Sequence, residues 1–337
     1  MTVTYGSSGL QDSARALMAR GSWSELSDLL DAHVDEVKLQ PELSTMRGES
    51  YLRSGAPRES RAWFAEAIPV IERRGDRSAL RRAINMIGVA DFQLGELESA
   101  APEFERALEL GQQDGDDLLV ARATNNLGMI ANIRAERERA LGLYAVALAA
   151  YQRLGDARGL AQSYHNIAIT FRDLGDLEQA DENELRAIEF ARDAANPVLV
   201  AQARLGRAEL GYRKGDSAFA EATASRVADD FARLGEPIQQ ADALRLAGLA
   251  ALAQDKLSVA GEALDRALVL ARRTGGALGE AEVLQARASL RLRERDHAGM
   301  RDDARAAIAI FARLHASDDE TALTAWLATH DNERLSS

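Results

Sequence analysis

The sequence contains no cysteine among its 337 residues. Disulfide bonds, thiolate metal ligands and a cysteine nucleophile are therefore excluded. Aromatic residues make up only 5% of the chain, and proline occurs six times. Four prolines stand where a helix is expected to begin, a position that proline tolerates: Pro41, Pro57, Pro197 and Pro237. The apolar residues are mostly alanine and leucine, which favours closely packed helices.

Positive charge is scarce relative to negative charge, because 41 basic residues face 53 acidic ones and give a net charge of −12. Binding to nucleic acid or to an anionic membrane needs clustered positive charge, so neither partner is expected. No run of about 18 apolar residues could span a bilayer. The opening residues, MTVTYGSSGLQDS, lack the pattern of a secretory signal peptide. We therefore expect a cytoplasmic protein.

Motifs that support catalysis or hold a cofactor are missing as well. The five histidines are far apart along the sequence, and none belongs to an H-E-x-x-H pair. Neither a phosphate-binding loop nor a G-x-S-x-G nucleophile motif occurs. Acidic residues are frequent, but those at helix starts are expected to act as caps. The sequence therefore predicts a noncatalytic protein with no cofactor and no metal.

What the sequence does contain is a series of turn residues at intervals of twenty. The series is Gly55, Gly75, Gly95, Gly115, Gly155, Gly175, Gly215, Gly235 and Gly275, with Ala195-Asn196 and Asp255 in two of the gaps. Between the turns, apolar residues recur three and four positions apart, which is the pattern of an amphipathic helix. Each turn residue would end one helix, and the acid that often follows it would cap the next.

The complete unit spans forty residues and contains two helices, which short loops make antiparallel. Small residues recur in three columns: Ala100, Ala140, Ala180, Ala220 and Ala260; Ala67, Ala107, Ala147, Ala187, Ala267 and Ala307; and Gly48, Gly88, Gly128, Ala168, Ala208, Gly248 and Ala288. Large residues recur at Phe64, Phe104, Tyr144 and Leu264. The small residues would let helix backbones approach, and the large ones would fill the space between helix pairs.

These columns resemble the tetratricopeptide repeat, with the clearest match at Tyr164, Ile167, Ala168 and Phe171, followed by Ala180. The resemblance covers roughly residues 42–315. The unit is longer than the family's, which has about 34 residues, and in this it is similar to the repeats of kinesin light chains and bacterial regulatory arrays. The resemblance implies an all-α fold, a right-handed superhelical solenoid of about seven antiparallel helix pairs with a C-terminal capping helix.

Three segments are expected along the chain. Residues 1–40 would form an atypical N-terminal helix pair, residues 41–316 the repeat solenoid, and residues 317–337 a capping helix and tail. In the last segment Leu323, Trp326 and Leu327 share one face of the expected helix, where they would cover the final repeat. The units at 197–236 and 277–316 depart from the pattern, with Arg204, Arg207 and Arg287 at or near signature positions.

The resemblance also implies a concave groove lined by the first helix of each unit. The family register places these residues there: Arg82, Asn85, Arg122, Asn125, Asn126, Asn132, Gln162, His165, Asn166, Arg172, Tyr212 and Arg213. Asparagine weakens a helix, and its amide suits the N–H and C=O groups of an extended peptide. We therefore expect the amides of Asn125, Asn126 and Asn166 to be exposed in the free protein. The lysines of the family's two-carboxylate clamp are absent, which argues against a C-terminal carboxylate as the ligand.

The predicted function is noncatalytic binding of a peptide or protein segment by an adaptor or regulator, with acidic or extended segments as candidate partners. Leu246, Leu249 and Leu252 make part of the same face apolar, so an amphipathic segment could dock there instead. Two alternatives remain open. One is a bacterial sensor of a small peptide or metabolite, and the other is a structural scaffold that self-associates as a homodimer.

Overall fold

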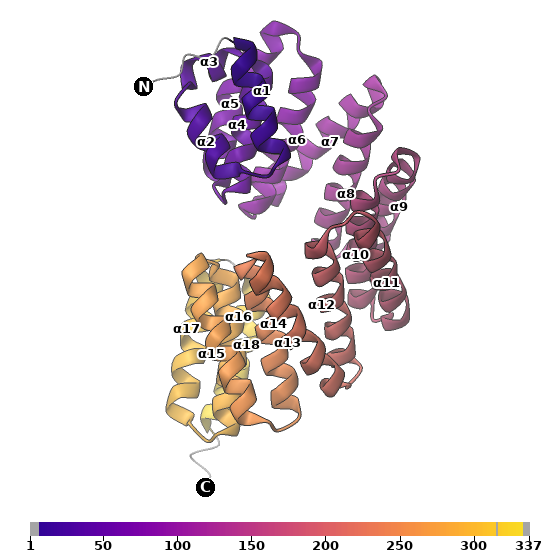
Figure 1. Cartoon of the computed structure of the whole chain (residues 1–337). Helices are drawn as coiled ribbons and strands as arrows, with labels where there is room; N and C mark the ends of the chain where they lie inside the picture. The colour runs from indigo at the N-terminus through magenta and orange to yellow at the C-terminus, as the bar shows by residue number, and fades with distance from the viewer. Residues whose placement is uncertain (1–6, 315, 333–337) are drawn as a thin grey trace. The chain divides into compact units, whose positions relative to one another are not determined.

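The computed structural model describes residues 7–314 and 316–332, and in these residues every element is an α-helix (Figure 1). The chain divides into two compact units, Met1–Ser163 and Tyr164–Ser337. The division falls inside one helix, α10 (Ala157–Leu174). The sequence pattern gives no sign of this division, because the forty-residue period continues through it.

Three helices, and not the expected pair, precede the repeats: α1 (Ser7–Ala19), α2 (Trp23–Asp31) and α3 (Val34–Leu39). The short α3 forms because Val37 is buried together with Leu10, Leu26 and Leu30 in one hydrophobic cluster. Buried Arg47 of the following helix donates hydrogen bonds to Ser27 and Asp31 of α2 and to Tyr51 Oη, 2.8 Å away. These bonds tie the N-terminal helices to the first repeat.

Seven helix pairs follow, in agreement with the predicted all-α fold. They are α4 (Pro41–Arg53) with α5 (Pro57–Arg74), α6 (Arg77–Gln93) with α7 (Leu97–Asp114), α8 (Asp117–Ile133) with α9 (Arg137–Leu154), α10 with α11 (Leu177–Asp193), α12 (Pro197–Arg213) with α13 (Ser217–Leu234), α14 (Pro237–Ala253) with α15 (Leu257–Thr274), and α16 (Ala277–Arg293) with α17 (His297–Arg313). The last helix is α18 (Ser317–Asn332).

The turn series is confirmed, and the structure adds two members to it. All nine glycines of the series have positive φ, as do Ala195 and Asp255. Ala135 and Arg295 adopt the same left-handed conformation at the two remaining intervals. The sequence did not reveal these two turns because a side chain in this conformation costs about 1–2 kcal/mol, so neither residue type signals it.

The predicted helix caps form where the turn is followed by aspartate or asparagine but not where it is followed by glutamate. The carboxylate of Asp216, for example, accepts a hydrogen bond of 3.0 Å from the backbone N–H of Phe219. Glu96, Glu136 and Glu236 make no such bond. Glutamate has one more methylene, so its carboxylate does not fold back onto the first turn as a short side chain does.

The glycines of the third column are needed because a large side chain lies directly against them. A Cβ atom on Gly128 would lie 2.5 Å from a ring carbon of Tyr144, and one on Gly88 would lie 2.7 Å from Phe104. A Cβ on Gly248 would lie 2.6 Å from Leu264. The large residues thus fill the space inside a helix pair, and not only the space between pairs.

Where the third column has alanine in place of glycine, the residue sixteen positions later is not one of the large apolar residues that face the glycines. Ala208 and Ala224 are both buried in one cluster, as are Ala288 and Ala304 in another. The forty-residue register therefore continues through the two degenerate units. Their charged residues are paired with acids, since Arg287 lies 3.2 Å from Asp303 on the second helix of its own unit.

The final helix packs as a cap on the second unit, as predicted. Leu323 is buried in the same cluster as Phe311 and Ala307 of α17, and Trp326 and Leu327 pack against that cluster. The boundaries proposed at residues 40 and 316 stay predictions. No described helix combines the length and the apolar character that crossing a membrane requires.

Candidate functional site

Each unit contains a hollow that is lined mainly by the first helices of consecutive pairs. The hollow of the first unit has a volume of about 440 Å³ and receives side chains from α4, α6, α8 and the start of α10. It contains five of the predicted binding residues: Asn85, Arg122, Asn125, Asn126 and Gln162. We call it the first hollow.

Asn125, one of the asparagines predicted to be exposed, is buried. Asn125 is only 8% exposed, and its Oδ1 accepts a hydrogen bond of 3.1 Å from the hydroxyl of Ser163. Asn85, forty residues earlier, is 2% exposed. Asn126 is half-buried, and Arg122 and Gln162 are exposed. The asparagine at 125 therefore has a structural reason, because it links α8 to α10, while Asn126 presents its amide to the hollow.

The first hollow also receives one side chain from the second helix of a pair. Tyr151 of α9 lines it and is only 4% exposed. Burial raises the pKa of Tyr151 to about 12, although the nearby charges of Arg122 and Arg158 act in the opposite direction. The hydroxyl therefore stays protonated and available as a hydrogen-bond donor at any ordinary pH.

The hollow of the second unit, the second hollow, has a volume of about 910 Å³. It receives side chains from the latter part of α10 and from α12, α14 and α16. Four predicted binding residues line it: His165, Arg172, Tyr212 and Arg213. Gln202, Asp242, Arg245 and Glu282 line it as well.

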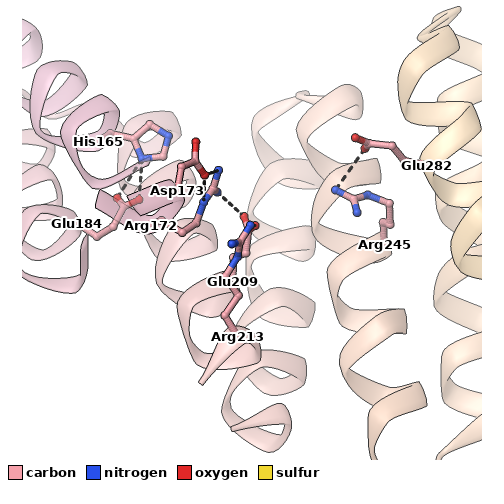
Figure 2. Close-up of polar contacts among 8 residues, drawn as sticks. All are labelled: His165, Arg172, Asp173, Glu184, Glu209, Arg213, Arg245 and Glu282. Carbon is pink, nitrogen blue, oxygen red and sulfur yellow. Dashed lines mark hydrogen bonds and ion pairs between the residues drawn. The ribbon is translucent and has the colours of Figure 1, made fainter. Parts of the chain in front are cut away.

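At one edge of the second hollow, His165 pairs with a buried carboxylate of α11 (Figure 2). The imidazole Nδ1 lies 3.0 Å from both carboxylate oxygens of Glu184, which is 2% exposed. Burial opposes protonation of His165, but the charge and hydrogen bond of Glu184 outweigh it and raise the pKa of the imidazole. Gly206 of α12 makes room for this pair, because a Cβ there would overlap the Glu184 carboxylate.

The arginines of the second hollow are neutralised by acids (Figure 2). Arg172 lies 2.8 Å from Glu209 and 3.1 Å from Asp173, and Arg213 lies 3.4 Å from the same Glu209. One of these pairs lies within α10, one within α12, and one joins the two helices. Each of these two arginine charges is therefore balanced by a nearby carboxylate.

Asp242 of α14 also lines the second hollow, near the ion pair between Arg245 and Glu282, whose charged atoms are 3.3 Å apart. Burial raises the pKa of Asp242 to about 6, Arg245 acts against this rise, and Glu282 adds to it. The folded state thus binds the Asp242 proton more tightly than the unfolded state does. The stability that this group contributes is present below the unfolded pKa and is lost as the pH rises through about 6.

Asparagine at position 242 cannot lose a proton, so the variant should not show this loss of stability. The free energy of unfolding of Asp242→Asn, relative to that of the wild type, should therefore rise by about 1–2 kcal/mol between pH 4 and pH 7. A shift of two pKa units would correspond to about 3 kcal/mol, and the partial exposure of the side chain reduces this. Urea denaturation of both proteins across this pH range measures the difference. A constant difference at every pH would contradict the raised pKa.

The apolar surface expected at α14 is smaller than the sequence suggested. Leu246 and Leu252 are buried in clusters with neighbouring helices, and Leu249 is half-buried. Packing against the helices on both sides of α14 buries most of this face. An amphipathic helix would find little of it exposed.

Three predicted residues line neither hollow: Arg82, Asn132 and Asn166. Arg82 is exposed on α6, and Asn132 and Asn166 are half-buried. Conversely, three residues of these sites were not predicted from the sequence: Tyr151, Arg158 and Glu184. Tyr151 lies on α9, Arg158 lies at the start of α10, and Glu184 is buried on α11. None of the three occupies a groove position of the family.

Among residues 7–314 and 316–332, no cluster of three acidic or histidine side chains could hold a metal ion.

Comparison with known proteins supports the repeat fold. Residues 116–193 match the family model described as tetratricopeptide repeat. No curated protein sequence matches the chain. Among solved structures, a Rap protein complexed with competence and sporulation factor has 15% identity and a TM-score of 0.67, over 97% of this chain and 98% of that one.

Two further solved structures share the fold. The apo form of the quorum sensor NprR from B. thuringiensis has 14% identity and a TM-score of 0.56, over 96% of this chain and 98% of that one. The Cut9–Hcn1 hetero-tetramer of the APC/C has 14% identity and a TM-score of 0.63, over 93% of this chain but only 55% of that one. Residues 116–193 therefore match the tetratricopeptide repeat, and the chain shares its helical-repeat fold with these solved structures.

Proposed function

We propose that the protein is a noncatalytic adaptor or regulator that binds a peptide or protein segment in its hollows, with the cytoplasm as its expected compartment. The observation that carries this proposal is that both hollows contain amide side chains without internal partners. Within the described residues, neither Asn126 in the first hollow nor Gln202 in the second makes a hydrogen bond. Such amides suit the backbone N–H and C=O groups of a bound peptide.

The size and the fold support the same proposal. Volumes of about 440 and 910 Å³ lie within the range of sites that hold small ligands and short peptide segments. The solved Rap structure with the same fold contains a bound competence and sporulation factor. Regulation through a bound peptide is thus compatible with this arrangement of helix pairs, and we extend it to this chain as part of the proposal.

The test begins with selection of binding peptides from a random displayed library on the full-length protein. The affinity of each selected peptide is then measured for Asn126→Ala and Gln202→Ala, one variant for each hollow. We expect one of the two to weaken binding about fivefold, equivalent to about 1 kcal/mol for one hydrogen bond. Neither variant should lose stability in urea, because neither amide has an internal partner.

Gln112→Ala is the matched control, because Gln112 is an exposed amide on α7 that lines neither hollow. Its affinity for the peptides should equal that of the wild type. Asn125→Ala should differ from all three variants by lowering stability by about 1–2 kcal/mol, since it leaves the buried Ser163 hydroxyl without its acceptor. Failure to select any peptide, or equal affinities for every variant, would contradict the proposed function.

The sensor of a small peptide or metabolite is a narrower form of the same proposal, because it would use the same hollows. It predicts a change in hydrogen exchange across a whole unit when the ligand binds. The self-associating scaffold makes a different prediction, a concentration-dependent dimer in light scattering.

A further inference from the structure

The first hollow carries a surplus of positive charge, although the protein as a whole has a net charge of −12. Its charged side chains are Arg53, Arg122, Arg158, Glu49 and Asp156. Arg53 lies 3.6 Å from Glu49, and the carboxylate of Asp156 accepts the backbone N–H of Gly159 at 3.0 Å as a helix cap. Within the described residues, the guanidinium groups of Arg122 and Arg158 make neither an ion pair nor a hydrogen bond.

The second hollow shows that this is not a general property of these surfaces. Each of its arginines, Arg172, Arg213 and Arg245, lies within 4 Å of a carboxylate of Glu209 or Glu282. Two arginines that make no ion pair within the described residues therefore distinguish the first hollow from the second. An acidic protein that keeps two unpaired guanidinium groups in one cavity has a local site suited to an anion.

Two buried polar side chains in the first hollow also lack partners. The Tyr151 ring packs over Gly159, where a Cβ would overlap it, and its hydroxyl makes no hydrogen bond within the described residues. Asn85 makes none either, although it is 2% exposed. Most buried polar groups in folded proteins have a partner. A ligand that accepts hydrogen bonds would supply one to the Tyr151 hydroxyl.

We infer that the first hollow contains a carboxylate subsite in which Arg122 and Arg158 bind an acidic side chain of the peptide and the Tyr151 hydroxyl donates a hydrogen bond to it. This inference rests on the proposed function, because it specifies one side chain of the bound peptide. Guanidinium groups match a carboxylate because they offer parallel N–H donors to its two oxygens. The remaining length of the peptide would lie along the amide side chains of α8 and α10.

The test uses three short probes on the full-length protein. One is the acetylated and amidated tripeptide Gly-Glu-Gly, the second is its Gly-Gln-Gly counterpart, and the third is acetylated Gly-Gly-Gly with a free C-terminus. Binding is followed by NMR through the Nε–Hε signals of ¹⁵N-labelled arginines. We expect the glutamate probe to bind about tenfold more tightly than the glutamine probe, because the neutral amide of glutamine cannot make the charge-assisted hydrogen bond that the carboxylate makes.

In the double variant Arg122→Ala/Arg158→Ala, the preference for glutamate over glutamine should fall close to one. Tyr151→Phe keeps the ring packing and should reduce the preference by about threefold. Arg74→Ala/Arg82→Ala is the charge-matched control, because both residues are exposed in the same unit and line neither hollow. It should retain the preference. If the alanine variant does not fold, Arg122→Gln and Arg158→Gln are measured singly.

The inference is overturned if the wild type does not prefer either carboxylate probe, or if a preference survives without Arg122 and Arg158. A stronger response to the free C-terminus that depends on both arginines would support the subsite and assign its carboxylate to a chain end. Library peptides that bind without an acidic residue, and that Arg122→Ala/Arg158→Ala binds equally well, would overturn the subsite while leaving the proposed function intact.

Discussion

Replacing Gly128 with alanine is expected to destabilise the protein by about 2–3 kcal/mol. The new Cβ would lie 2.5 Å from one ring carbon of Tyr144 and 2.8 Å from another. The ring is only 1% exposed, so the helices α8 and α9 must separate or the ring must leave its favoured rotamer. Alanine is the better helix former by about 1 kcal/mol, which offsets only part of this cost. Urea denaturation followed by circular dichroism measures the change.

Gly142→Ala is the matched control, since it makes the same substitution in the middle of α9. A Cβ there meets nothing within 4 Å, so the variant should be more stable by about 0.5–1 kcal/mol. In a Tyr144→Ala background, Gly128→Ala should lose most of its cost, because the pair would then match Ala208 and Ala224. Destabilisation of equal size at positions 128 and 142 would show that the overlap with Tyr144 is not the cause.

Deleting residues 318–337 is expected to cost about 2–4 kcal/mol, comparable to removing a buried aromatic side chain. The deletion removes Leu323, which is 2% exposed, together with Trp326 and Leu327. It exposes part of the cluster that contains Phe311 and Ala307 of α17, against which these side chains pack. A terminal repeat without a polar outer face associates with other molecules, so we expect lower solubility as well. Thermal melting and light scattering on the same preparations test both effects.

Leu323→Ala separates packing from chain length in this experiment. It should account for about 2 kcal/mol or more, because the residue is buried, whereas Thr324→Ala at the neighbouring exposed position should change stability by less than about 0.5 kcal/mol. An unchanged melting temperature and a monomeric truncated protein would show that α18 does not cap the second unit.

The sequence by itself determined the helices of the repeats and their pairing, but not the three helices that precede them. A period of twenty in the turn residues sets the helix lengths, and a period of forty in the small residues sets which positions meet, because each repeat contacts mainly its neighbours. The columns at Gly128 and Ala147 could therefore be assigned to packing positions without any coordinates. The groove positions followed from the same register, and nine of the twelve predicted residues line one of the two hollows.

Only the tertiary structure decided which polar side chains are bound internally and which are free to bind a ligand. Asn125 and Asn126 are identical neighbours in sequence, yet the first is held by Ser163, 38 residues away, and the second faces the hollow. Arg172 and Arg122 both belong to first helices, yet Arg172 pairs with Glu209 whereas Arg122 makes no ion pair within the described residues. Tyr151 lines the first hollow although it belongs to α9, the second helix of its pair. A repeat pattern fixes where backbones lie, but hydrogen bonds and ion pairs depend on side chains that differ from one repeat to the next.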